Sequence, residues 1–185
     1  HPDINGDGVP EFAIGESEYD GSSGNAGIVR VFSGADASVL REFYGPASQA
    51  SDQGFGWEMT AGEDRNNDGF HEIFVGARKG GTGGHYSGSL TCVDGATGSF
   101  IYVINGQGQY DYASRVGLLG PDIDGDGFSD YAVGAEENYA NSGDGYVRII
   151  SAKNGNTILT IDGWGGRTTI SVLRIAGSTT LMAMV

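Results

Sequence analysis

Cysteine is nearly absent from this chain of 185 residues, which contains only Cys92. A lone cysteine cannot form a disulfide within the chain, so stability has to come from packing or from bound metal. Cys92 stands between Thr91 and Val93 in a stretch that reads as a strand. We therefore expect it to be a small buried core residue and not a nucleophile.

Histidine and long apolar runs are also scarce. Of the three histidines, His1 is terminal and His71 lies in an acidic loop, which leaves only His85 outside these places. No nucleophile and base pair can be proposed from them, and no P-loop, dinucleotide fingerprint or HExxH motif occurs. No apolar run approaches the ~20 residues of a transmembrane helix. We expect a protein without enzymatic activity that does not insert into membranes.

Glycine, in contrast, is abundant. The chain has 34 glycines and only four prolines, without the third-residue period of collagen. Helical periodicity is absent, and apolar residues alternate in short runs between turn signals, so an all-β fold is predicted. The formal net charge of −14 disfavours nucleic acid as a partner. The chain starts at His1 without a methionine, and we expect a processed chain or part of a longer one.

Ten of the negative charges belong to three copies of one pattern, D-x-[DN]-x-D-G-x-x-[DE], at 3–11, 64–72 and 122–130. Each copy places oxygen-bearing side chains at positions 1, 3, 5 and 9. These groups would repel one another unless a hard cation lay between them, and Ca2+ accepts six to eight flexible oxygen ligands. Glycine at position 6 permits a positive φ, which allows the carbonyl at position 7 to turn inward.

The pattern therefore predicts three calcium sites. The expected ligands are Asp3, Asn5, Asp7, Val9 and Glu11 in the first loop, Asp64, Asn66, Asp68, Phe70 and Glu72 in the second, and Asp122, Asp124, Asp126, Phe128 and Asp130 in the third. The third loop has four carboxylates, so we expect it to bind calcium most tightly. An EF-hand is excluded, because position 12 is Ile14, Val75 or Val133 where an EF-hand requires glutamate.

The loops start 61 and 58 residues apart, which predicts a repeat architecture. Alternation in the second repeat predicts four strands, at 54–61, 71–77, 89–93 and 99–104. Four antiparallel strands in ~60 residues is the size of a β-propeller blade. We expect one repeat domain with three to three and a half such blades and a calcium loop in the first hairpin of each. The repeats are predicted at 1–45, without its first strand, at 46–105, at 106–162, and at 163–185 as a partial blade lacking a metal loop.

These motifs resemble the FG-GAP repeat of integrin α-subunit propellers and of bacterial secreted proteins. The resemblance rests on Phe55-Gly56, on the acidic loops, and on the Val-Gly-Ala triplets at 75–77 and 133–135, and it covers residues 1–162. The third repeat departs from it with Val116-Gly117 in place of Phe-Gly. The resemblance implies a propeller whose calcium loops lie on the face opposite the ligand-binding loops.

The sequence thus predicts a calcium-stabilised recognition or adhesion module that is not catalytic. Millimolar calcium outside cells places it in the medium or at the cell surface. A protein or glycan ligand is expected at the loops joining second and third strands, which carry Tyr19, Tyr86 and Tyr139. Exposed edge strands predict self-association. The alternatives are a structural subunit of a calcium-dependent filament or surface assembly, and an accessory propeller of a polysaccharide-active enzyme.

Overall fold

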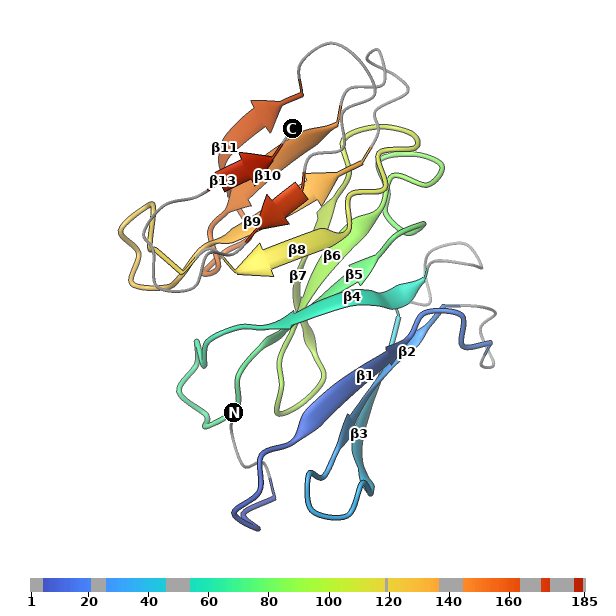
Figure 1. The fold of residues 1–185 in the computed structure, drawn as a ribbon, viewed down its shortest axis with the longest axis vertical. Coiled ribbons are helices and arrows are strands. Elements are labelled where there is room, and N and C mark those ends of the chain that lie inside the picture. The colour runs from blue at the N-terminus through green and yellow to red at the C-terminus, as the bar shows by residue number, and fades with distance from the viewer. Residues whose placement is uncertain are drawn as a thin grey trace.

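A computed structural model describes residues 5–20, 26–45, 54–118, 120–136, 145–163, 171–173 and 182–184. These residues form thirteen β-strands and no helix (Figure 1). The strands are β1 Phe12–Glu16, β2 Ile28–Phe32, β3 Val39–Tyr44, β4 Phe55–Ala61, β5 Ile73–Ala77, β6 Ser89–Val93, β7 Phe100–Asn105, β8 Arg115–Leu118, β9 Tyr131–Ala135, β10 Tyr146–Ile150, β11 Thr157–Asp162, β12 Ser171–Leu173 and β13 Met182–Met184. The predicted all-β class is confirmed. The described residues contain no helix that is long and apolar enough to span a membrane.

Each sheet consists of strands that are consecutive in the chain, and adjacent strands within a sheet are antiparallel. The sheets are β1-β2-β3, β4-β5-β6-β7, β8-β9-β10-β11 and the hairpin β12-β13. In the second sheet the predicted strands match to within two residues, and β6 matches at both ends. Residues 71 and 72 are polar and belong to the acidic loop, so β5 begins at Ile73.

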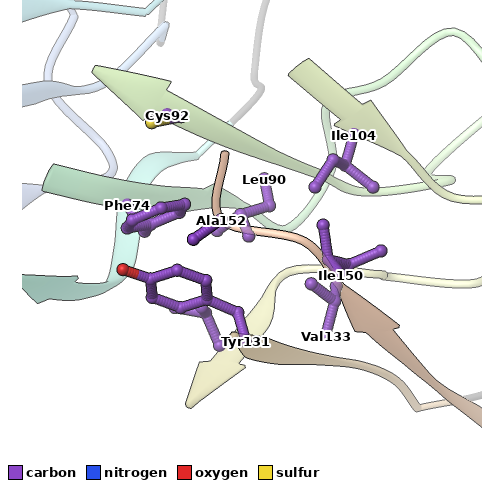
Figure 2. Close-up of a cluster of buried hydrophobic side chains, with 9 residues drawn as sticks. Phe74, Leu90, Cys92, Ile104, Tyr131, Val133, Ile150 and Ala152 are labelled. Atoms are coloured by element: carbon purple, nitrogen blue, oxygen red, sulfur yellow. The ribbon is translucent and has the colours of Figure 1, made fainter. Parts of the chain in front are cut away.

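The second sheet buries both of its faces. One face packs against the third sheet in a core that unites Phe74, Leu90, Cys92, Ile104, Val116, Tyr131, Val133, Ile150 and Ala152 (Figure 2). The rings of Phe74 and Tyr131 meet there with centroids 3.8 Å apart. The other face packs against the first sheet through Val29, Val31, Phe43, Phe55, Val75, Ala77 and Val93. Burial on both faces explains why β5 and β6 are apolar along most of their length.

Glycine sets how closely neighbouring sheets approach. A Cβ at Gly76 would overlap the carbonyl oxygen of Ser114, the residue that precedes β8, and would lie 3.2 Å from Ser114 Cβ. A Cβ at Gly15 would overlap the carbonyl of Gly56 in β4 in the same way. These glycines hold equivalent positions in the first two repeats, twelve residues after the loop's first aspartate. A side chain at either position would hold the next sheet away.

The Phe-Gly pair lies at an irregularity of β4. The pairing of β4 with β5 shifts between Phe55 and Glu58, which is the mark of a β-bulge. Phe55 is fully buried in the core between the first two sheets, and Gly56 has a φ of +89°. Trp57 follows in the bulge and remains 49% exposed. The bulge thus turns one aromatic ring into the core and leaves the next one accessible.

The described strands do not close into a ring. The first sheet has three strands with β1 at its edge, and β12 pairs with β13 while lying near β8 and β9. Figure 1 shows the sheets following one another along the molecule. The array of antiparallel sheets is therefore present, whereas a closed propeller is not seen in the described residues.

Cys92 provides a probe of the core. Its side chain is fully buried, and burial raises the pKa of the thiol to about 11. At pH 8 only about one thiol in a thousand is ionised, compared with about a quarter for a free cysteine. We expect the folded protein to react with a thiol reagent more than 100-fold more slowly than the protein in denaturant. Equal labelling rates, measured by mass spectrometry, would contradict this burial.

Candidate metal centre and the opposite loop surface

The three acidic loops share one backbone hydrogen-bond pattern. In each, the N–H at position 5 donates to the side chain at position 3, and the N–H at position 7 donates to the carboxylate at position 5. The pairs are Asp7 N to Asn5 Oδ1 (2.9 Å), Asp68 N to Asn66 Oδ1 (3.0 Å), Asp126 N to Asp124 Oδ1 (3.1 Å), Val9 N to Asp7 Oδ1 (2.8 Å), Phe70 N to Asp68 Oδ1 (2.8 Å) and Phe128 N to Asp126 Oδ1 (3.0 Å). The glycines at position 6 have φ angles of +85° (Gly8), +90° (Gly69) and +97° (Gly127). The positive φ predicted at this position is confirmed.

The carboxylate at position 1 organises the second and third loops. Asp64 accepts hydrogen bonds from Asp68 N at 3.1 Å and Gly69 N at 2.9 Å. Asp122 accepts the equivalent bonds from Asp126 N at 3.0 Å and Gly127 N at 2.8 Å. These bonds, led by that from Gly127, hold the pKa of the Asp122 carboxyl below its usual value. Asp122 is therefore ionised near neutral pH, as a calcium ligand must be.

In the third loop, three carboxylates converge. One oxygen each of Asp122, Asp124 and Asp130 lies within 4.8 Å of the other two. Among the described residues, this is the only group of three His, Cys, Asp or Glu side chains that is so compact. The fourth predicted carboxylate, Asp126, accepts a hydrogen bond from Ser151 Oγ at 2.8 Å and does not belong to the group.

The acid at position 9 is buried in both complete loops. Glu72 is 1% exposed and Asp130 is fully buried. Burial raises the pKa of each carboxyl above its usual value, although Glu72 accepts a bond from Arg65 N at 3.0 Å and Asp130 one from Ile123 N at 2.6 Å. Neither forms an ion pair with a cationic side chain among the described residues. A buried carboxylate that is ionised needs a compensating positive charge, which a bound metal ion would supply.

Each loop also touches the turn between the third and fourth strands of its own repeat. Ser33 Oγ donates to Asp7 at 3.4 Å, and Ser151 Oγ donates to Asp126 at 2.8 Å. In the second repeat the equivalent residue is Asp94, which accepts a bond from Asn66 Nδ2 at 3.1 Å. The turn therefore adds polar oxygen atoms beside position 5 in the first and third loops and beside position 3 in the second.

Neighbouring loops contact one another across the sheet interface. Ser129, in the third loop, donates its hydroxyl to Glu63 at 2.6 Å and its N–H to the other Glu63 oxygen at 3.3 Å. Arg65, in the second loop, donates to the Lys153 carbonyl and lies with its guanidinium 6.0 Å from the centre of the Phe128 ring. The second and third loops therefore support each other.

Of the predicted ligands in the first loop, Asp3 lies outside the described residues. Asn5, Asp7 and Val9 are exposed and show the shared hydrogen bonds, and Glu11 is half-buried.

Four rings gather at the other end of the strands. β5 leaves the second acidic loop and ends at the 78–88 loop, where His85 and Tyr86 have ring centroids 3.8 Å apart. Tyr110, from the connection between the second and third sheets, lies 5.4 Å from His85 and 5.9 Å from Tyr86. Tyr112 stacks at 5.9 Å from Tyr86. We call His85, Tyr86, Tyr110 and Tyr112 the tyrosine platform.

All three tyrosines of the platform have left-handed backbone conformations. The φ angles are +55° for Tyr86, +63° for Tyr110 and +51° for Tyr112. Only two other described residues besides glycine, Ala37 and Asn67, have a positive φ. Such a conformation costs about 1–3 kcal/mol for a bulky residue and persists only where the surroundings impose it.

Hydrogen bonds between the two segments impose these conformations. Tyr110 N donates to the His85 carbonyl at 2.8 Å, and Tyr112 N donates to the Tyr86 carbonyl at 3.1 Å. Between them, the fully buried Asp111 accepts three bonds of 2.8 Å, from Gln107 N, Gly108 N and Tyr146 Oη. The platform is therefore fixed in advance of any ligand.

Tyr19 and Tyr139 are the other two tyrosines predicted to contact a ligand. Tyr19 lies with its ring centre 5.0 Å from the Arg30 guanidinium and 6.3 Å from the ring of Tyr44. Tyr139 lies outside the described residues.

Comparisons with known proteins leave the family open. No family model matches the chain, and no curated protein matches it. Among solved structures, a rhamnogalacturonan lyase from Bacillus licheniformis aligns with a TM-score of 0.37 and 15% identity over 87% of this chain. The rhamnogalacturonan lyase YesW aligns with a TM-score of 0.36 and 14% identity over 84%. The chain spans 38% and 37% of the lengths of those two enzymes, and matches at this level assign neither a fold nor a function.

The sequence alone does not predict the tyrosine platform. It predicts a ligand contact for Tyr86 and none for Tyr110 or Tyr112. No sequence signal links residues 86 and 110, because their proximity depends on how two sheets pack. The same holds for the approach of Glu63 to Ser129.

Proposed function

We propose that this protein is a calcium-stabilised recognition module of the FG-GAP type, without catalytic activity, that acts outside the cell or at its surface. Calcium binds at the acidic loops and holds the first hairpins of the second and third sheets closed. A protein or glycan ligand binds at the opposite end of the strands, where the loops between second and third strands lie.

The observation that carries the proposal is the convergence of carboxylates around a buried acid in the third loop. Asp122, Asp124 and Asp130 hold the ion, and the Phe128 carbonyl adds a ligand. The ion compensates for the buried Asp130 charge, which no cationic side chain of the described residues pairs with. The second loop, with its buried Glu72 and identical hydrogen bonds, holds a second ion, and the first loop a third.

The separation of the two ends supports a recognition role. The second acidic loop and the tyrosine platform lie at opposite ends of β5, so calcium in that loop remains remote from a ligand on the platform. Calcium in this arrangement contributes folding free energy and takes no part in chemistry.

Calorimetric titration with Ca2+ tests the proposal. We expect three bound ions per chain and a tightest site that weakens about 10-fold in Asp124→Asn, because the substitution removes one ligand charge. Asp162→Asn, which changes an exposed aspartate outside the loops, is the matched control and leaves all three sites unchanged. A chain that binds no calcium would refute the proposal, and an unaltered tightest site in Asp124→Asn would refute the ranking.

A further inference from the structure

The tyrosine platform has an accessible surface. Tyr86, Tyr110 and Tyr112 are half-buried and His85 is exposed. The centroids of five of the six ring pairs lie 3.8 to 6.4 Å apart, so the four rings form one aromatic cluster that is partly exposed. Strained backbone at three adjoining aromatic residues is a cost to the fold, and such strain concentrates where a site needs a side chain in one place.

The surroundings of the platform are polar. Its two segments, 78–88 and 106–114, contain no valine, leucine, isoleucine or methionine. Seven of their other 16 residues are glycine, and the rest include hydroxyl and amide side chains such as those of Thr82, Gln107 and Gln109 and the charged Arg78, Lys79 and Asp111. An interface for a protein partner usually has an apolar core. Here the tyrosine rings bear hydroxyl groups and lie among mainly polar residues.

The Arg78 charge beside the platform is already neutralised. The Arg78 guanidinium lies 4.4 Å from the Tyr112 ring centre and 5.5 Å from that of Trp57, and it pairs with Glu136 at 2.9 Å. Glu136 also pairs with Arg115 at 2.8 Å. With a formal net charge of −14 on the whole chain, this end of the molecule offers little attraction to an anionic ligand.

We propose that the tyrosine platform binds a neutral glycan built of pyranose rings. One face of a pyranose presents C–H groups, which pack on an aromatic face, and its rim presents hydroxyl groups. The tyrosine hydroxyls and the His85 imidazole bind that rim, since each can donate or accept a hydrogen bond. Because the platform is rigid before binding, little conformational entropy is lost. This inference rests on the proposed function and specifies its ligand.

The test is calorimetric titration of the calcium-saturated protein with cellotetraose, mannotetraose, xylotetraose and galactotetraose, and with tetragalacturonate as the anionic counterpart. We expect at least one neutral tetrasaccharide to bind with a Kd below about 1 mM. In Tyr86→Asn and Tyr112→Asn that affinity falls at least 10-fold. Asparagine tolerates a left-handed backbone, so these variants keep the melting temperature to within about 2 °C. Tyr44→Ala, at an exposed tyrosine of β3, keeps full affinity.

Several outcomes would overturn the inference. These are no binding of any neutral tetrasaccharide at about 10 mM, binding of tetragalacturonate alone, or full affinity in both asparagine variants. A large loss of thermal stability in the variants without saccharide binding would mean that the tyrosines serve packing. Tyrosine-dependent binding of a random peptide library, with no saccharide bound, would indicate a protein partner instead. Calcium titration of the same sample separates the proposals: intact calcium sites without saccharide binding overturn only the ligand class.

Discussion

Removal of calcium is expected to lower the melting temperature by about 20–30 °C. At free calcium 100-fold above Kd, each site adds about 2.7 kcal/mol to the free energy of unfolding, so three sites add about 8 kcal/mol. For a chain of this size, 1 kcal/mol corresponds to about 2–4 °C. The physical source is the third loop's carboxylate group and the buried acids Glu72 and Asp130, which lose their compensating charge when the ion leaves.

Thermal unfolding followed by circular dichroism, in millimolar calcium and in excess chelator, measures this effect. Excess magnesium in place of calcium is the control. We expect it to restore only a small part of the lost stability, because magnesium demands a rigid octahedral geometry. Identical melting temperatures with calcium and with chelator would show that the loops are acidic turns that bind nothing.

Gly76→Ala is expected to destabilise the protein by about 3 kcal/mol and to lower the melting temperature by roughly 6–12 °C. The new Cβ would overlap the Ser114 carbonyl oxygen. Neither segment can easily retreat, because Gly76 lies in the fully buried part of β5 and Ser114 is 1% exposed. The second and third sheets would have to move apart, and the core around Phe74 and Tyr131 would loosen.

Gly120→Ala separates this effect from backbone strain. Gly120 has a φ of +92°, and a Cβ added there would meet no atom within 4 Å. The substitution therefore carries only the cost of a left-handed conformation, about 1 kcal/mol. Denaturant unfolding of both variants measures the difference. If Gly76→Ala costs no more than Gly120→Ala, close approach of the sheets is not what requires glycine at position 76.

Local patterns in the sequence are sufficient to predict the strands and the backbone conformation of the acidic loops. Alternation locates β6 at both ends, and the D-x-[DN]-x-D-G spacing locates the positive φ at Gly8, Gly69 and Gly127. Both depend on residues close together in the chain, where side-chain periodicity and backbone sterics dominate. The burial of Cys92 follows from the same alternation.

Features that depend on packing between sheets are not predictable in this way. The glycines at constant spacing are visible in the sequence, but the reason for them, overlap with the next sheet at Ser114 or Gly56, is a three-dimensional fact. Likewise, Asp126 has the spacing of a ligand, yet Ser151 from a later turn contacts it. The platform requires Tyr86 and Tyr110 to meet across 24 residues of chain.

The pairing of every strand with its sequence neighbours has a consequence for how the protein forms. No sheet has to wait for a distant part of the chain, so loop-closure entropy is small and each sheet can assemble as soon as its own ~60 residues are present. The second and third acidic loops each lie within a single hairpin, between β4 and β5 and between β8 and β9. If these loops bind calcium as proposed, the ion can capture one hairpin at a time as each is completed along the chain.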